Sequence, residues 1–197
     1  MLFTGRLQYF NYVISHINSK DYKKVIDNET LFIDKEPLNL IHIPLIQRLF
    51  PNAKIIFSLR HPIAVCLSNF QQNFNINTEM IKLITFDDCV ARYINVMKLL
   101  KVYQKELSLN MHTIRYEDLV SDLPREAKKL FTFLNIQGND EYLNFHLYAQ
   151  NKFISTPSRE QVNQPLYKDS IEKWQHYLPF LPTSVKKLDD FINEFGY

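Results

Sequence analysis

The sequence predicts an α/β protein, with a parallel sheet that carries helices on both faces. Two short and mainly apolar runs, residues 54–59 and 111–114, have the length and continuous hydrophobicity of buried parallel strands. Segments with helical spacing of apolar residues follow both runs, and this alternation is typical of right-handed βαβ crossovers. A chain of 197 residues with 46% apolar content is long enough for one domain with a hydrophobic core.

The first third of the chain predicts a short strand, a helix and then the first long apolar strand. Residues 31–33 are an apolar run that fits a strand, after an N-terminal stretch with weak helical periodicity. Residues 38–50 share one apolar face, which predicts a helix with a kink at Pro44. The run 54–59 predicts a strand that is buried on both faces. Pro62 suits the first turn of the helix that follows and continues to residue 70.

The rest of the chain predicts a second strand among further helices. Asp87 and Asp88 stand where a helix dipole favours acidic residues, at the start of a helix over residues 87–107. The second strand covers residues 111–114, and Pro124 opens the next helix. The remaining expected elements are a helix at 125–134, a loop at 150–168 and short helices at 170–177 and 185–195.

Composition excludes several classes of protein. The net charge of +2 and the pI of about 8.4 are lower than expected of a dedicated nucleic-acid binder. The cysteines, Cys66 and Cys89, form no CxxC pair and are expected as buried thiols, and the histidines lack the spacing of metal ligands. The longest apolar run, residues 63–67, is far short of the roughly 20 residues of a membrane span. With no signal peptide recognised, we expect a cytoplasmic protein without a metal.

Polar side chains follow both predicted strands. Arg60 ends the first strand, and Tyr116 follows the second. Ligands of parallel α/β sheets bind beyond the carboxyl ends of the strands, and a guanidinium there offers paired donors to a phosphate. The alternative is that Arg60 is a plain surface residue and Tyr116 part of the core. We expect Glu117 and Asp118 to cap the next turn.

Four segments together resemble the PAPS-dependent sulfotransferases, in which PAPS is 3′-phosphoadenosine 5′-phosphosulfate. The similarity is greatest to the tyrosylprotein sulfotransferase-like and TPR-associated bacterial branch. The segments are IDKEPLN at 33–39, FPNAKII at 50–56 continuing through RHP at 60–62 to Ser68, IRYEDLV at 114–120, and STPSREQV at 155–162 continuing through Pro165 and Tyr167 to IEKW at 171–174. The resemblance covers about residues 30–195 and implies the P-loop nucleotide-kinase-like, three-layer sulfotransferase fold.

The resemblance also implies a role for particular residues. It makes PAPS the co-substrate and a protein tyrosine, a glycan or a small alcohol the hydroxyl acceptor. Lys35 matches a lysine that stabilises charge on the leaving phosphate. Trp174 is expected to be a packing anchor. The implied nucleotide-binding residues are Arg60 and Ser68 at the 3′-phosphate, Tyr116 near the nucleotide, and Ser158 and Lys173 over the phosphates.

The sequence departs from the family at its start. No segment matches the first strand and phosphate loop of these enzymes. Pro37 stands where the cytosolic small-molecule branch has the histidine that acts as general base. We therefore expect residues 1–197 to be a single, N-terminally incomplete sulfotransferase domain. A partner chain or dimer is a candidate source of the missing elements. The alternative is an inactive remnant that binds a 3′-phosphoadenosine nucleotide or a protein partner; a nucleotide kinase relative is a weaker third reading, because it would need a Gly-rich Lys-Ser/Thr loop.

Overall fold

The chain, seen in a computed structural model, divides into two compact units. The structure describes residues 2–15, 31–72, 80–150, 163–166 and 168–197. The first unit comprises Met1–Ala53 and Lys98–Asn110, and the second comprises Lys54–Met97 and Met111–Tyr197. The parallel sheet and the residues at its carboxyl edge belong to the second unit.

The two predicted strands pair side by side, as expected. Strand β1 (Ile55–Leu59) and strand β2 (Met111–Arg115) are parallel. Their register runs from Ile55 opposite Met111 to Leu59 opposite Arg115, so both strands end at the same level. The residues that directly follow them are therefore neighbours at one edge of the sheet.

The two faces of β1 differ in burial, and the prediction of a strand buried on both faces is wrong. Phe57 and Leu59 are buried, whereas Ile56 and Ser58 are exposed. On the exposed face Ile56 pairs with His112, whose ring stacks on Phe133 with centroids 5.2 Å apart. Helix α7 (Leu123–Leu134), which carries Phe133, thus covers the β2 side of this face and leaves β1 open among the described residues.

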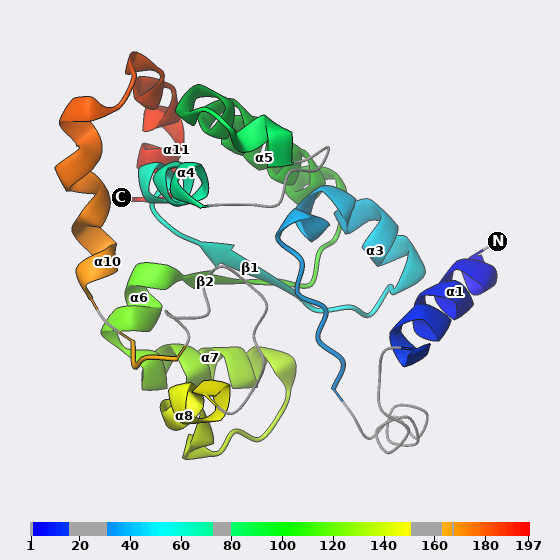
Figure 1. Ribbon diagram of the computed structural model, residues 1–197. Coiled ribbons are helices and arrows are strands. Elements are labelled where there is room, and N and C mark those ends of the chain that lie inside the picture. The colour runs from blue at the N-terminus through cyan, green and yellow to red at the C-terminus, as the bar shows by residue number, and fades with distance from the viewer. Residues whose placement is uncertain (1, 16–30, 73–79, 151–162, 167) are drawn as a thin grey trace. The chain divides into compact units, whose positions relative to one another are not determined.

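Helices lie on both faces of the sheet, as the fold class predicted (Figure 1). Helix α4 (Pro62–Gln71), the start of α5 (Phe86–Glu106), the 3-10 helix η5 (Thr183–Leu188) and α11 (Asp189–Glu194) pack on the Phe57 side. Helix α6 (Tyr116–Ser121) and α7 lie on the other side. The core of this unit includes Phe57, Leu59, Ile63, Cys66, Leu67, Phe86, Cys89, Val90, Tyr93, Leu188 and Phe191.

Local sequence signals fix where the main helices begin and end. Pro62 occupies the first turn of α4, where its missing N–H costs no hydrogen bond. Asp122 is the N-cap of α7, and its carboxylate accepts a hydrogen bond from the backbone N–H of Arg125 at 3.1 Å. Helix α7 ends at Asn135, which adopts the left-handed conformation with φ of 59°. The predicted helices over 63–70, 87–107 and 125–134 are confirmed to within two residues.

The first unit differs from the prediction in two places. Residues 38–50 form not one kinked helix but a 3-10 helix, η1 (Pro37–His42), followed by α3 (Ile43–Leu49). Pro44 lies in the first turn of α3, which tolerates proline, so the chain restarts a helix there. The apolar run 31–33 forms no strand, because no strand of the described chain pairs with it, and its side chains are exposed. The unit begins with α1 (Leu2–Ser15).

Short helices build the rest of the second unit. They are η2 (Met80–Leu83), η3 (Asp140–Asn144), α8 (Phe145–Gln150), α10 (Asp169–Glu172) and η4 (Lys173–Phe180). The expected loop over 150–168 lies largely outside the described residues. Cys66 and Cys89 are buried free thiols, as predicted, and burial raises the pKa of both, that of Cys89 to about 11. In the part of the chain that the structure describes, no helix combines the length and apolar character that a membrane span requires.

Candidate functional site

Arg60 and Tyr116 meet at the carboxyl edge of the sheet, as their places after the two strands predicted. Arg60 directly follows β1, and Tyr116 begins α6 directly after β2. The guanidinium carbon of Arg60 lies 4.6 Å from the centroid of the Tyr116 ring, a cation–π distance. Because the two strands end at the same level, the Arg60 guanidinium lies on the Tyr116 ring at the carboxyl edge, where ligands of such sheets bind.

Ser170 of α10 joins this pair with both its backbone and its side chain. Its carbonyl oxygen accepts a hydrogen bond from Nη2 of Arg60 at 2.8 Å. Its hydroxyl lies 2.6 Å from the Tyr116 hydroxyl, and either oxygen can donate. Nε of Arg60 is buried and has no hydrogen-bond partner among the described residues. The guanidinium is thus held by one hydrogen bond and one aromatic ring, and its buried Nε–H is an unsatisfied donor among the described residues.

Arg60 lies next to the start of a helix. Helix α4 begins two residues after Arg60, and the first N–H groups of a helix have no intrahelical acceptor. Ser68 lies two turns into α4 and is half-buried. Lys173 is exposed at the start of η4, three residues after Ser170. At the start of α4, Pro62 has no N–H, and the His61 N–H donates to the Glu117 carboxylate. Ile63 and Ala64 therefore carry the first-turn N–H groups that have no intrahelical acceptor.

Tyr116 is the predicted site residue that the structure brings into contact with Arg60, and two others, Ser158 and Lys35, cannot be placed beside it. Ser158 lies outside the described residues. Lys35 is exposed and directly precedes Glu36, the N-cap of η1, in the first unit. No cluster of His, Cys, Asp and Glu side chains in the described ranges could hold a metal ion.

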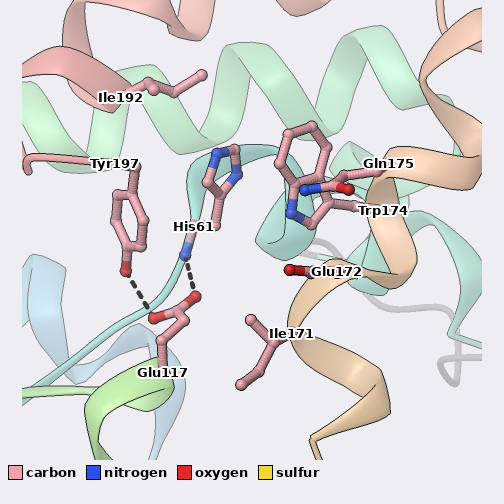
Figure 2. A pocket seen from close by; sticks show the side chains of 8 residues that line it. All are labelled: His61, Glu117, Ile171, Glu172, Trp174, Gln175, Ile192 and Tyr197. Carbon is pink, nitrogen blue, oxygen red and sulfur yellow. Dashed lines mark hydrogen bonds between the residues drawn. The ribbon is translucent and has the colours of Figure 1, made fainter.

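Glu117 links the Arg60 turn to the end of the chain. Its carboxylate accepts a hydrogen bond from the backbone N–H of His61 at 3.0 Å and another from the Tyr197 hydroxyl at 2.9 Å (Figure 2). The prediction that Glu117 caps the next turn is therefore wrong, since its carboxylate reaches two distant segments. Burial and the Glu117 carboxylate raise the pKa of Tyr197, so this hydroxyl stays protonated and donates.

His61 is packed between two aromatic side chains beside a cavity. Its ring stacks on Trp174 with centroids 4.1 Å apart and meets the ring of Tyr197 edge-on at 4.9 Å. The predicted role of Trp174 as a packing anchor is confirmed. The cavity has a volume of about 430 Å³. It is lined by His61, Glu117, Ile171, Glu172, Trp174, Gln175, Ile192 and Tyr197 (Figure 2).

Arg115 holds the C-terminal segment against this cluster. Its guanidinium lies over the Tyr197 ring at 4.1 Å and donates to the carbonyl oxygens of Phe195 and Gly196. Gly196 has a φ of 68°, a conformation that favours glycine. Both arginines at the ends of the strands thus donate to carbonyls of the chain, and Arg60 has in addition a buried Nε without a partner among the described residues.

The protonation of His61 should make stability depend on pH. Burial lowers the pKa of His61 below its ordinary value of 6.5; Arg60 adds to this, and Glu117 opposes it. As the pH falls below about 6.5, the unfolded chain therefore takes up a proton that the folded chain does not, and the free energy of unfolding decreases. The variant His61→Phe keeps an aromatic ring on Trp174 and should lose less stability than the wild type between about pH 7 and pH 5. Urea unfolding at both pH values measures this, and equal losses in the two proteins would contradict it.

Sequence reasoning missed Ser170, Tyr197 and the true partners of Glu117. Ser170 lies 54 residues from Tyr116 along the chain, and Tyr197 lies 80 residues from Glu117. No local pattern marks such contacts. The nearest signal in the sequence is the expected short helix at 170–177, which begins at Ser170 and contains Lys173 and Trp174.

The sequence also matches a family of known proteins. The profile of the family described as "Sulfotransferase family" matches residues 6–140. A protein of Aquifex aeolicus (strain VF5) is 28% identical over 163 residues, which are 80% of this chain and 21% of that protein. A putative protein-tyrosine sulfotransferase of Caenorhabditis briggsae is 23% identical over 180 residues, 83% of this chain and 59% of that protein. This chain thus spans less than two thirds of the length of either relative.

A solved structure shows the same fold. The sulfotransferase domain from the curacin biosynthetic pathway superposes with a TM-score of 0.63 at 20% sequence identity, over 93% of this chain and 76% of that one. Its level of identity supports the fold alone. The family profile, in contrast, covers more than half of the sequence, including both strands and the residues that follow them. This chain belongs to the sulfotransferase family.

Proposed function

We propose that this chain binds PAPS at the Arg60 site and transfers its sulfuryl group to a hydroxyl acceptor. The observation that carries the proposal is the Arg60 guanidinium, which is held at the carboxyl edge of the sheet with a buried Nε–H free. A phosphate oxygen can accept from Nε and a second from a neighbouring Nη, which is the paired geometry that arginine favours.

The 3′-phosphate of the nucleotide is the group that fits this position. Arg60 would donate to it, and the hydroxyl of Ser68 and the first N–H groups of α4 would add further donors. The Tyr116 ring packs against one face of the guanidinium. Lys173 and Ser158 are proposed to bind the phosphates from the segment that follows, as the family resemblance implies.

The chemistry of transfer requires the leaving phosphate to be stabilised. When bound, PAPS would supply the sulfuryl group: the bond from sulfur to the bridging phosphate oxygen would break as the bond to the acceptor oxygen forms, 3′-phosphoadenosine 5′-phosphate would leave, and the acceptor hydroxyl would release its proton to a base or to solvent. Lys35 is proposed to place its ammonium near that bridging oxygen and to stabilise the negative charge that develops there. Lys35 is exposed, and its side chain is therefore accessible to a ligand.

The acceptor is proposed to be a hydroxyl group, with a peptide tyrosine as the first class to test. The relative from Caenorhabditis briggsae carries the name of a putative protein-tyrosine sulfotransferase, and one from Danio rerio is called protein-tyrosine sulfotransferase 1. Transfer from radiolabelled PAPS to a tyrosine peptide, a glycan and a small alcohol compares the three classes. Binding of the nucleotide without transfer to any of them would limit the function to nucleotide binding.

Nucleotide binding is tested by calorimetric titration of the full chain. We expect 3′-phosphoadenosine 5′-phosphate to bind at least about tenfold more tightly than adenosine 5′-phosphate, because only the first offers a phosphate to Arg60. The two ligands share the adenosine and the 5′-phosphate, so their ratio isolates the 3′-phosphate. Equal affinities, or no binding by a folded chain, would contradict the proposal.

A further inference from the structure

We propose that Ser170 is a positioning residue of the nucleotide site, which holds the Arg60 guanidinium in the orientation that receives the 3′-phosphate. The inference rests on the proposed function of Arg60. Nothing in the sequence singled out Ser170, and its contacts come from the structure alone. It is half-buried in α10, between the end of β1 and the end of β2.

Ser170 contacts both members of the Arg60–Tyr116 pair. Its carbonyl oxygen accepts from Nη2 of Arg60 at 2.8 Å, and its hydroxyl lies 2.6 Å from that of Tyr116. The Tyr116 ring in turn supports the guanidinium at 4.6 Å. The three residues therefore form a closed set of contacts in which each one touches the other two.

This arrangement limits the motion of a flexible side chain. An arginine has many rotamers, and a ligand that must first order it binds less tightly. The hydrogen bond from Nη2 to Ser170 and the contact with the Tyr116 ring together fix the plane of the guanidinium. The buried Nε has no partner among the described residues. Ser170 thus takes one of the two hydrogens of Nη2, and the anion is proposed to accept from the buried Nε–H, which has no other acceptor among the described residues.

The role of the hydroxyl is tested by the variant Ser170→Ala. We expect it to weaken binding of 3′-phosphoadenosine 5′-phosphate by about 5- to 20-fold and to leave the affinity for adenosine 5′-phosphate within about twofold. Ser170→Thr keeps a hydroxyl and should retain most of the preference. Ser184→Ala is the matched control, because the Ser184 hydroxyl is buried without a partner among the described residues, and it should change neither affinity.

A second variant approaches the same hydrogen bond from the other side. Tyr116→Phe removes only the hydroxyl that contacts Ser170 and keeps the ring under Arg60. Ser170→Ala and Tyr116→Phe remove the same hydrogen bond. The double variant should therefore bind 3′-phosphoadenosine 5′-phosphate no more weakly than either single variant. Losses of binding free energy that add up in the double variant would contradict the claim that the two hydroxyls act through one hydrogen bond. Thermal unfolding of each variant shows whether it is folded, and Tyr116→Phe remains informative if Ser170→Ala is not.

The outcomes separate this inference from the proposed function. If Arg60→Ala removes the preference for the 3′-phosphate while Ser170→Ala and Tyr116→Phe retain it, the positioning role is wrong and the nucleotide site stands. If Ser170→Ala weakens both nucleotides equally, Ser170 only supports the local fold, which also overturns the inference. If the wild type shows no preference, the proposed function fails, and the role of Ser170 fails with it.

Discussion

Replacing Arg60 with alanine is expected to abolish the preference of the chain for 3′-phosphoadenosine 5′-phosphate over adenosine 5′-phosphate. A charge-assisted pair of hydrogen bonds to a phosphate contributes about 1.5–3 kcal/mol, which corresponds to roughly 10- to 100-fold in affinity. Arg60→Lys should restore only part of the preference, because an ammonium keeps the charge but lacks the paired donors. Calorimetric titration of the three proteins with both nucleotides measures the effect.

The control for this experiment is the stability of the variants. Arg60 also stacks on Tyr116 and donates to Ser170, so its removal costs some packing. Both variants should nevertheless bind adenosine 5′-phosphate about as well as the wild type if they are folded. A folded Arg60→Ala protein that still prefers the 3′-phosphorylated ligand would place the phosphate elsewhere.

The variant Glu117→Ala is expected to lower the free energy of unfolding by about 2–4 kcal/mol, because two hydrogen bonds to a charged acceptor are lost. The backbone N–H of His61 and the Tyr197 hydroxyl both donate to this carboxylate, and both are left without it. Glu117→Gln keeps one carbonyl acceptor and should lose less. Chemical denaturation followed by fluorescence measures the difference.

Two further variants serve as comparisons for Glu117→Ala. Tyr197→Phe removes only one of the two donors and should cost about 1 kcal/mol. Glu172→Ala removes an exposed carboxylate from the same cavity and should cost little. Equal stability of Glu117→Ala and Glu172→Ala would show that the hydrogen bonds of Glu117 do not stabilise the fold.

The sequence predicted the sheet and its main helices because their signals are local. The apolar runs of β1 and β2, and the prolines at the starts of α4 and α7, are each read within a few residues. The errors come from contacts that local patterns do not report. Residues 31–33 have the composition of a strand but no partner strand among the described residues, and β1 is open on one face because α7 packs toward β2.

The sequence predicts the part of the candidate site that follows directly from the two parallel strands. Parallel strands place Arg60 and Tyr116 at one edge, and the structure brings them into contact. Ser170 and Tyr197 come from the last 30 residues of the chain and reach the site through the tertiary fold. A serine in the first turn of a short helix or a tyrosine after a helix gives no sign of such a contact in the sequence.

The measurement that tests the central claim most directly is a crystal structure of the chain with 3′-phosphoadenosine 5′-phosphate bound. The account predicts that oxygens of the 3′-phosphate accept hydrogen bonds from Nε and a terminal nitrogen of Arg60, with the Ser170 carbonyl still bound to Nη2. A nucleotide bound with its 3′-phosphate away from Arg60 would contradict the proposed site, even if the affinity for the ligand were high.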